Sequence, residues 1–217
     1  MTARLPEVVR PLLALLALFS GIALLVNILA RVSLRVTLAT AVSVMGLGLA
    51  SVIWRAPAPA RRLIARSIRI GGVSGFIATL AYDLSKAALS VLDPSPYNPF
   101  EAIRAFGKLL AGPAAGERAI VASGAAFHLL NGTMFGVAYV FLFARDGAIS
   151  GGRALATGVA WGIFLEFFQL TLYPGWLDIR AYKEFAMISA LGHVVYGATL
   201  GTIALTLFRS GHAGRVA

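Results

Sequence analysis

The chain has 217 residues, of which 59% are hydrophobic and 13% are charged. A soluble domain has about half apolar and a quarter charged residues, so this composition excludes an ordinary soluble enzyme. There is no cysteine, which excludes disulfides, thiolate metal sites and cysteine nucleophiles. The net charge of +10 does not indicate nucleic acid, because arginines in so hydrophobic a chain typically flank membrane spans. The composition predicts an integral membrane protein whose partner is the lipid bilayer.

Six stretches are long and apolar enough to cross a membrane as helices, which takes about 20 residues each. They are roughly 11–30, 33–54, 70–92, 119–143, 154–173 and 185–208. The first is too long for a signal-peptide core and is followed at once by the second, so we expect it to be retained. The sequence therefore predicts an all-α bundle of six transmembrane helices that forms one integral membrane domain over residues 1–217.

The distribution of arginine and lysine predicts the orientation of this bundle. Six spans put both termini on one side, and that side carries eleven of the 19 basic residues, against six on the other side. The positive-inside rule then places both termini in the cytoplasm. The Pro- and Arg-rich connection 55–69 is the expected boundary between a peripheral hairpin, 11–54, and a four-helix core, 70–208.

Two connections on the outer side are longer than turns. Residues 93–117 begin with DPSPYNP and continue as an amphipathic segment, whose apolar residues share one helical face: Phe100, Ile103, Phe106 and Leu110. This pattern predicts a short helix lying in the membrane interface. The other connection carries three aromatic residues typical of the headgroup level: Tyr173, Trp176 and Tyr182. Anchoring is the simpler interpretation of both, and a lid over an outward-opening site is the alternative.

An internal repeat is the most informative pattern. The fourth and sixth spans both contain His-xxx-Gly-xxx-Gly, at His128, Gly132 and Gly136 and at His193, Gly197 and Gly201. The third and fifth spans match at the same four-residue steps: Gly75, Thr79 and Asp83 correspond to Gly158, Gly162 and Glu166. Residues four apart share a helix face, and faces of small residues let membrane helices pack closely. The pattern predicts two copies of one hairpin related by a pseudo-twofold axis along the membrane normal.

The same spacing predicts a buried polar cluster. Asp83, His128, Glu166 and His193 each lie seven to ten residues from the outer end of a span, or roughly 10–15 Å deep at ~1.5 Å per residue. Asn131, Gln169 and Tyr196 lie within one helical turn of these residues and complete the cluster. A carboxylate at the bilayer centre costs at least ~2.5–3.5 kcal/mol, so such residues are candidates for function.

Several interpretations of this cluster remain open. A neutral imidazole bonded to a protonated acid is a sufficient clamp between helices, whereas an exchanging chain would conduct protons or a small solute. A divalent metal could be held by Asp83, His128, Glu166 and His193, and haem b could take the two histidines as axial ligands. The protein could also be a structural subunit that docks with other membrane subunits or forms a homo-oligomer. No catalytic residue is predicted, because Ser123 near His128 lacks a nucleophile elbow.

Two further charged residues fall inside predicted spans. Asp83 and Lys86 are one turn apart, which predicts an intrahelical ion pair with the lysine extending outward toward the interface. We expect Arg35 to extend toward the interface in the same way rather than to contact a ligand.

Residues 70–205 resemble the YagU-type inner-membrane proteins and their relatives. The resemblance rests on the Gly-rich third span, on FGVAYVFLF at the end of the fourth, on LYPGWLDI where the fifth ends, and on EFAMISALGHVVYG opening the sixth. It implies a bacterial inner-membrane protein of undefined biochemical activity that is linked to acid tolerance. It implies no catalytic residues.

Overall fold

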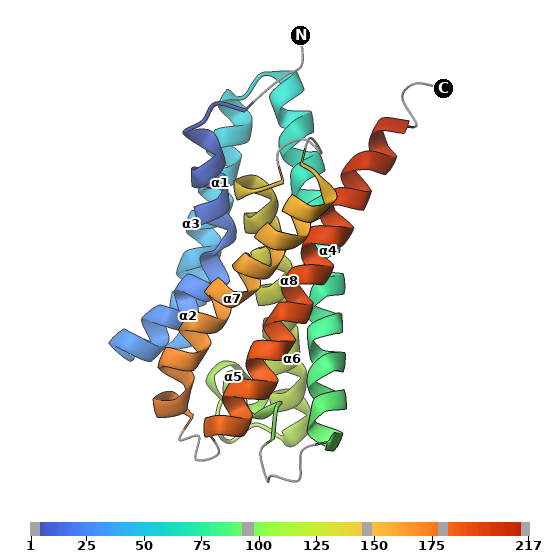
Figure 1. Cartoon of the computed structure of the whole chain (residues 1–217). Helices are drawn as coiled ribbons and strands as arrows, with labels where there is room; N and C mark the ends of the chain where they lie inside the picture. The colour runs from blue at the N-terminus through green and yellow to red at the C-terminus, as the bar shows by residue number, and fades with distance from the viewer. Residues whose placement is uncertain (1–4, 93–97, 145–148, 178–181, 214–217) are drawn as a thin grey trace.

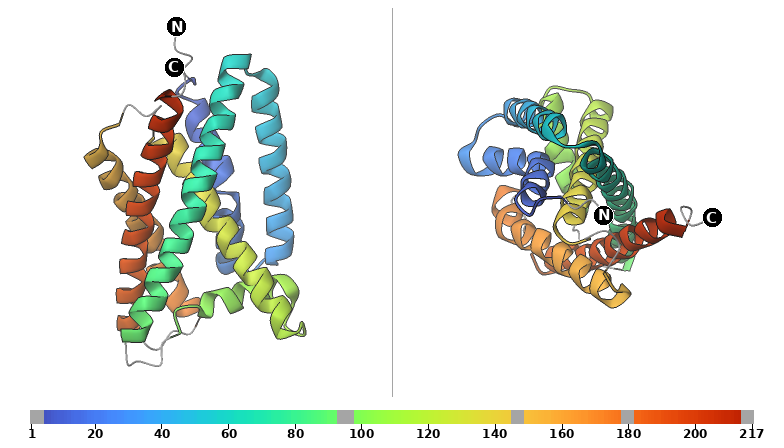
Figure 2. Two further views of the ribbon diagram at one scale, coloured as in Figure 1. Left: turned by 90° about the vertical axis from the view of Figure 1, so that its right-hand side faces the viewer. Right: turned by 90° about the horizontal axis from the view of Figure 1, so that it is seen from above.

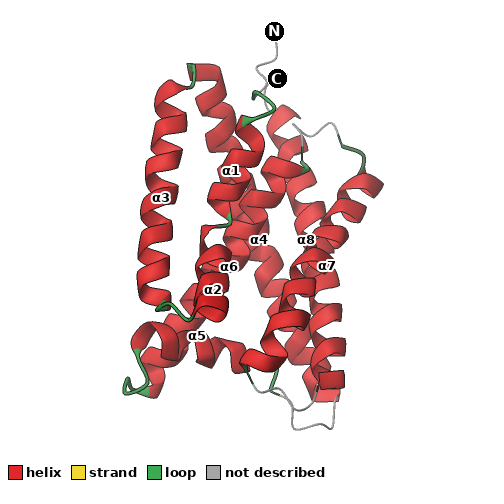
Figure 3. Ribbon diagram, turned by 90° about the vertical axis from the view of Figure 1, so that its left-hand side faces the viewer, coloured by secondary structure: helices red, strands yellow, loops and turns green. Residues whose placement is uncertain are grey.

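The computed structural model of the chain describes residues 5–92, 98–144, 149–177 and 182–213. Within these ranges all regular elements are helices joined by loops (Figure 3). The helices are α1 Val9–Ala17, α2 Phe19–Ala30, α3 Leu34–Arg55, α4 Ala58–Leu92, α5 Glu101–Ala111, α6 Glu117–Leu142, α7 Gly151–Trp176 and α8 Tyr182–Ala213. The all-α prediction is confirmed.

Five helices are long and apolar enough to cross a membrane, namely α3, α4, α6, α7 and α8. The first predicted span is a pair, α1 and α2, bent by 58°. A Ser–Gly pair, Ser20 and Gly21, follows the bend, and such pairs are a known cause of kinks. Ser20 Oγ donates a hydrogen bond to Asn131 Oδ1 of α6 (2.7 Å), which directs the start of α2 into the bundle. The described residues thus contain five candidate membrane spans, or six if the bent pair crosses as one.

The helices form an upright bundle in which α1 begins and α8 ends at the same end (Figure 1). The short helix α5 lies at the opposite end, across the foot of the bundle (Figure 2). The closest packing is between α7 and α8, α4 and α6, and α4 and α8, and α1 packs against α6. Fully buried residues from these helices make one core, among them Ile64, Ala78, Tyr139 and Leu200. By contrast, the most apolar stretch of α3 has no buried residue.

The predicted boundary at 55–69 is mostly helical. Helix α4 begins at Ala58, and Arg61 N already donates to Pro57 O (3.1 Å). Prolines are tolerated in the first turn of a helix, because the amide there has no partner within the helix. The connection between α3 and α4 is therefore reduced to Ala56 and Pro57.

The amphipathic segment forms the expected helix, α5. It packs against the bundle and is not only an anchor in the membrane interface. Phe106 of α5 is 3% exposed and packs against Phe127, with ring centres 5.2 Å apart. Tyr173 and Trp176 of α7 pack against the same ring, at 6.3 and 5.9 Å. These two aromatic residues thus hold α5 against the bundle, whereas the side chain of Tyr182 and residues 93–97 lie outside the described part of the chain.

Arg35 also contacts α5. Its Nε donates a hydrogen bond to Leu110 O (2.6 Å), one of the carbonyl groups left free at the end of that helix. A guanidinium at a helix C-terminus also meets the negative end of the helix dipole. Arg35 therefore ties the start of α3 to the end of α5 rather than simply extending toward lipid headgroups.

Candidate functional site

A cavity of about 210 Å³ lies among α2, α4, α5, α6, α7 and α8. For comparison, an apolar cavity of ~150 Å³ already holds benzene. Six of the seven residues in the predicted polar cluster line it: Asp83, His128, Asn131, Gln169, His193 and Tyr196. The seventh, Glu166, is 3% exposed and lies against His193. The cavity is therefore the place where the candidate residues of four helices come together.

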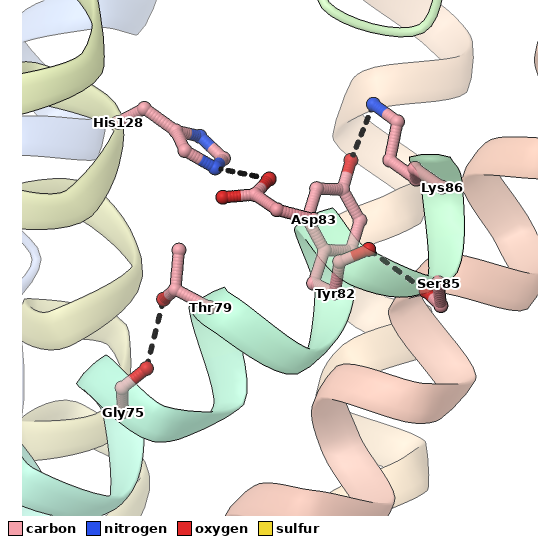
Figure 4. A network of polar contacts seen from close by, with 7 residues as sticks. All are labelled: Gly75, Thr79, Tyr82, Asp83, Ser85, Lys86 and His128. Atoms are coloured by element: carbon pink, nitrogen blue, oxygen red, sulfur yellow. Dashed lines mark hydrogen bonds and ion pairs between the residues drawn. The ribbon is translucent and has the colours of Figure 1, made fainter. Parts of the chain in front are cut away.

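The first pair of ionisable groups joins α4 to α6. Asp83 Oδ1 lies 2.8 Å from His128 Nε2, and Figure 4 shows the carboxylate pointing across to the ring. The two side chains are 25% and 20% exposed, and both line the cavity. One turn earlier on α4, Thr79 Oγ1 donates to Gly75 O (2.8 Å), so its hydroxyl is bound within its own helix. The pair is thus open to a molecule in the cavity.

The second pair joins α7 to α8 and is more enclosed. Glu166 Oε2 lies 2.7 Å from His193 Nδ1, and their side chains are 5% and 11% exposed. Ser189 Oγ donates to the same carboxylate oxygen (2.8 Å), and Gln169 Nε2 donates to Ser189 Oγ. Glu166 Oε1 is buried with no hydrogen-bond partner among the described residues. Glu166 therefore lies on the side of His193 away from the cavity and holds the ring in the cavity wall.

The ring of Tyr82 contacts the imidazoles of both pairs. Its centre is 5.9 Å from that of the His128 ring and 4.8 Å from that of the His193 ring. Gly192 of α8 makes room for it, since a Cβ at that position would lie 2.9 Å from the tyrosine ring. Sequence reasoning missed Tyr82, and its only local signal was its position next to Asp83.

Lys86 is a correction to the sequence-based prediction. Its side chain is 5% exposed, so it points into the protein instead of outward. Nζ donates a hydrogen bond to the Tyr82 hydroxyl (3.1 Å; Figure 4) and lies 5.9 Å from the centre of the Phe100 ring. Contact with aromatic rings and a hydroxyl offsets part of the cost of burying an ammonium group. The lysine thus belongs to the cavity wall.

The glycines predicted to pack helices together lie at two contacts. Gly75 faces Gly132 and Gly136 where α4 meets α6, and a Cβ on Gly136 would lie 2.5 Å from Gly75 Cα. The corresponding contact between α7 and α8 is equally close, with a Cβ on Gly197 only 2.2 Å from the carbonyl oxygen of Gly158. Gly162 and Gly201 also lie against the backbone of the partner helix in this contact. Each acid–imidazole pair therefore sits beside a backbone-to-backbone contact.

The bundle is closed on the side of the cavity away from α5. Tyr196 donates to Gly132 O (2.8 Å), which ties α8 to α6 at the cavity wall. Beyond this point residues 137–141 of α6 are all buried, each at most 3% exposed. The cavity accordingly occupies the half of the bundle that carries α5.

The residues present do not fit a metal ion or haem. Among the described residues, no three His, Asp or Glu side chains lie close enough together to hold a metal ion. Haem bound by His128 and His193 would need a flat space between the imidazoles, and the Tyr82 ring, in contact with both of them at 5.9 and 4.8 Å between ring centres, would have to move to provide it. In this arrangement His128 and His193 each have a carboxylate partner instead.

Comparisons with family models, with curated proteins and with solved structures gave no match to this chain. The geometry of the cavity and of the two acid–imidazole pairs is therefore what supports a function.

Proposed function

We propose that the chain is a bacterial inner-membrane protein that conducts protons through this cavity, in which a small solute also binds. The observation that carries the proposal is the Asp83–His128 pair, 2.8 Å apart, in the wall of a cavity between apolar helices. Carboxylate and imidazole side chains are the groups that commonly form proton relays inside membrane proteins. Their retention inside apolar helices, at a cost of several kcal/mol, favours a functional role.

The proposal includes the six-span topology with both termini in the cytoplasm. The bent pair α1–α2 then crosses as one span, and the cavity, beside α5, faces the outer side. The resemblance of residues 70–205 to YagU-type proteins is part of the same proposal and supplies its link to acid tolerance.

We further propose that α4–α6 and α7–α8 are two copies of one hairpin. Supporting this are their matching features, a glycine contact and an acid–imidazole pair at 2.8 Å in one hairpin and 2.7 Å in the other. Repeated units that rock against each other around a fixed site are a common basis of transport. Here the movement would open the packed side of α6 at residues 137–141 while closing the side with α5.

Proton flux into liposomes tests the proposal. Purified protein is reconstituted with an internal pH-sensitive dye, and an inward proton gradient is imposed. We expect flux above that of protein-free liposomes, and a reduction of roughly tenfold or more in Asp83→Asn and in His128→Gln, since neither substitute titrates. The matched control is Glu117→Gln, because Glu117 is an exposed acid of α6 paired with Arg104. Wild-type flux equal to that of empty liposomes, or unchanged in both variants, would overturn the proposal.

The exposed face of α3 favours a second candidate function, that of a subunit in a larger membrane assembly. Its most apolar stretch has no buried residue, although the helix packs along α2. A homo-oligomer or a complex with other membrane subunits would cover this face. Mass measurement of the protein purified in mild detergent tests it: a monomer without stoichiometric partners contradicts the assembly role.

A further inference from the structure

We infer that the cavity takes a lipid-soluble molecule with an apolar body and an uncharged oxygen-bearing head, such as a polyprenyl alcohol, and that this molecule enters sideways from the bilayer between α2 and α7. The inference rests on the proposed function and names the substrate class of the same cavity.

The opening of the cavity is indicated by residues that both line it and are exposed. Ile22 of α2 is 39% exposed, and Phe164 and Phe168 of α7 are 47% and 37% exposed, yet all three belong to the cavity wall. Helix α2 packs mainly against α3 and α6, whereas α7 packs mainly against α8. The exposed surface of a spanning helix faces lipid chains, so this mouth opens into the hydrocarbon region.

The wall has an apolar part and a polar part. Side chains from α2, α7 and the break between α1 and α2, joined by Phe135 of α6, supply much of the apolar part: Leu18, Leu25, Ile28, Phe135, Leu165 and Leu172. The polar part comes from α4, α6, α8 and Gln169 of α7. A water-soluble solute would make no apolar contacts with the apolar part of the wall. An amphiphile would place its chain against that part and its head against the polar groups.

The charges in the wall favour an uncharged head. Asp83 is paired with His128, and the Lys86 ammonium is buried against Tyr82. A carboxylate and an ammonium group therefore both lie at the polar end of the cavity. An anionic head would meet the Asp83 carboxylate and a cationic head the Lys86 ammonium, and like charges in a low-dielectric site repel strongly. The side-chain amides of Asn131 and Gln169 also line this end and suit a hydroxyl or carbonyl group.

The size of the cavity is consistent with this ligand. About 210 Å³ exceeds the ~150 Å³ that accommodates a benzene ring but is too small for a whole long-chain lipid. The head and the first part of the chain would therefore occupy the cavity. The rest of the chain would leave through the mouth and lie in the bilayer.

Photolabelling of the full chain in lipid nanodiscs tests the inference. The probe is a long-chain alcohol with a diazirine next to its hydroxyl end, and labelled peptides are identified by mass spectrometry. We expect labelling of α2, α6 and α7, suppressed by excess unlabelled alcohol but much less by a fatty acid or an alkyltrimethylammonium ion.

Two substitutions on α2 provide a matched comparison. Ile22→Trp places a larger side chain in the mouth and should reduce labelling by roughly tenfold, since the ligand loses its fit. Val26→Trp should leave labelling unchanged, because Val26 is 38% exposed one turn further along α2 but lies outside the cavity wall. Phe168→Trp repeats the test from α7, and melting temperatures show which variants are folded.

Three outcomes would overturn the inference: equal labelling in Ile22→Trp, Phe168→Trp and wild type, equal competition by the fatty acid, or no labelling of the cavity wall. If labelling fails while Asp83→Asn still abolishes proton flux, the ligand class is wrong and the proposed function stands. If labelling succeeds without any proton flux, the proposed function is wrong and the ligand class stands.

Discussion

The two acid–imidazole pairs differ in their exposure. Asp83 and His128 are 25% and 20% exposed and face the cavity directly. Glu166 and His193 are 5% and 11% exposed, and only the histidine belongs to the cavity wall. A solute can therefore contact Asp83, whereas Glu166 acts through the ring that it orients. Substitutions in the two pairs should accordingly have different effects on stability.

Glu166→Gln and Glu166→Ala separate a functional role from a purely structural one. An amide can still bond to Ser189 and His193, so Glu166→Gln should change the free energy of unfolding by about 1 kcal/mol or less. Alanine removes the acceptor of the buried Ser189 hydroxyl and the carboxylate partner of His193, whose Nδ1 keeps the Ser189 carbonyl oxygen at 3.1 Å, and should cost about 1–3 kcal/mol. The measurements are melting temperature in detergent and proton flux in liposomes.

We expect Glu166→Gln to lose most of the flux while it stays folded, because an amide does not titrate. Glu101→Gln, at an exposed acid of α5, is the control. Unchanged flux in Glu166→Gln would leave the Glu166–His193 pair as a structural clamp.

At the scale of the helices, the closest contacts are made by backbone atoms. Where α7 meets α8, a Cβ on Gly162 would lie 2.1 Å from the carbonyl oxygen of His193, and a Cβ on Gly201 would lie 2.2 Å from that of Ala154. A backbone cannot move aside as a flexible side chain can, so any larger residue must separate the two helices. Because His193 lies in this contact, separation of the helices would also displace its ring.

Gly197→Leu tests this contact. Its side chain would collide with the backbone of Gly158 and Val159, and we expect a destabilisation of at least about 1–3 kcal/mol, measured as a lower melting temperature. Gly46→Leu on α3 is the matched control, because no atom lies within 4 Å of a Cβ at that position. Equal melting temperatures for the two variants would contradict the close packing of α7 and α8.

At the scale of the whole molecule, the arginine-rich start of α4 and the cavity lie toward opposite ends of the bundle. The connection at Ala56 and Pro57 lies at the end of the bundle opposite α5, and arginines cluster in the helix that follows it. If this end is cytoplasmic, the cavity belongs to the outer half of the membrane. The orientation therefore decides from which side the site is approached.

Single cysteines test the orientation, and the chain has no native cysteine to remove. Ala58 and Pro113 are both exposed; Ala58 begins α4, and Pro113 follows α5 at the opposite end of the bundle. With an impermeant thiol reagent added outside intact cells, Pro113→Cys should be labelled and Ala58→Cys should be protected until the cells are opened. The reverse pattern would turn the cavity toward the cytoplasm.

The sequence by itself determined the helical class and the position of the apolar segments, although α4 begins at Ala58, twelve residues before the predicted start at residue 70. The predicted stretches 70–92, 119–143, 154–173 and 185–208 all lie within or end within one residue of α4, α6, α7 and α8. Length and hydropathy are properties of a continuous segment, so they can be read without knowing the neighbours. The same is true of the spacing by four that put glycines and ionisable residues on one face.

Only the tertiary structure decided which of these residues meet and how. The pairing of Asp83 with His128, the contact of the Tyr82 ring with both imidazoles and the inward direction of Lys86 depend on how α4 is rotated and shifted against α6 and α8. The direction of α2 after its bend, and with it the cavity mouth beside Ile22, depends on contacts between residues more than a hundred positions apart, such as that of Ser20 with Asn131. A local pattern specifies the face of a helix but not the partner of that face, because register and rotation between helices are set by packing of the whole bundle.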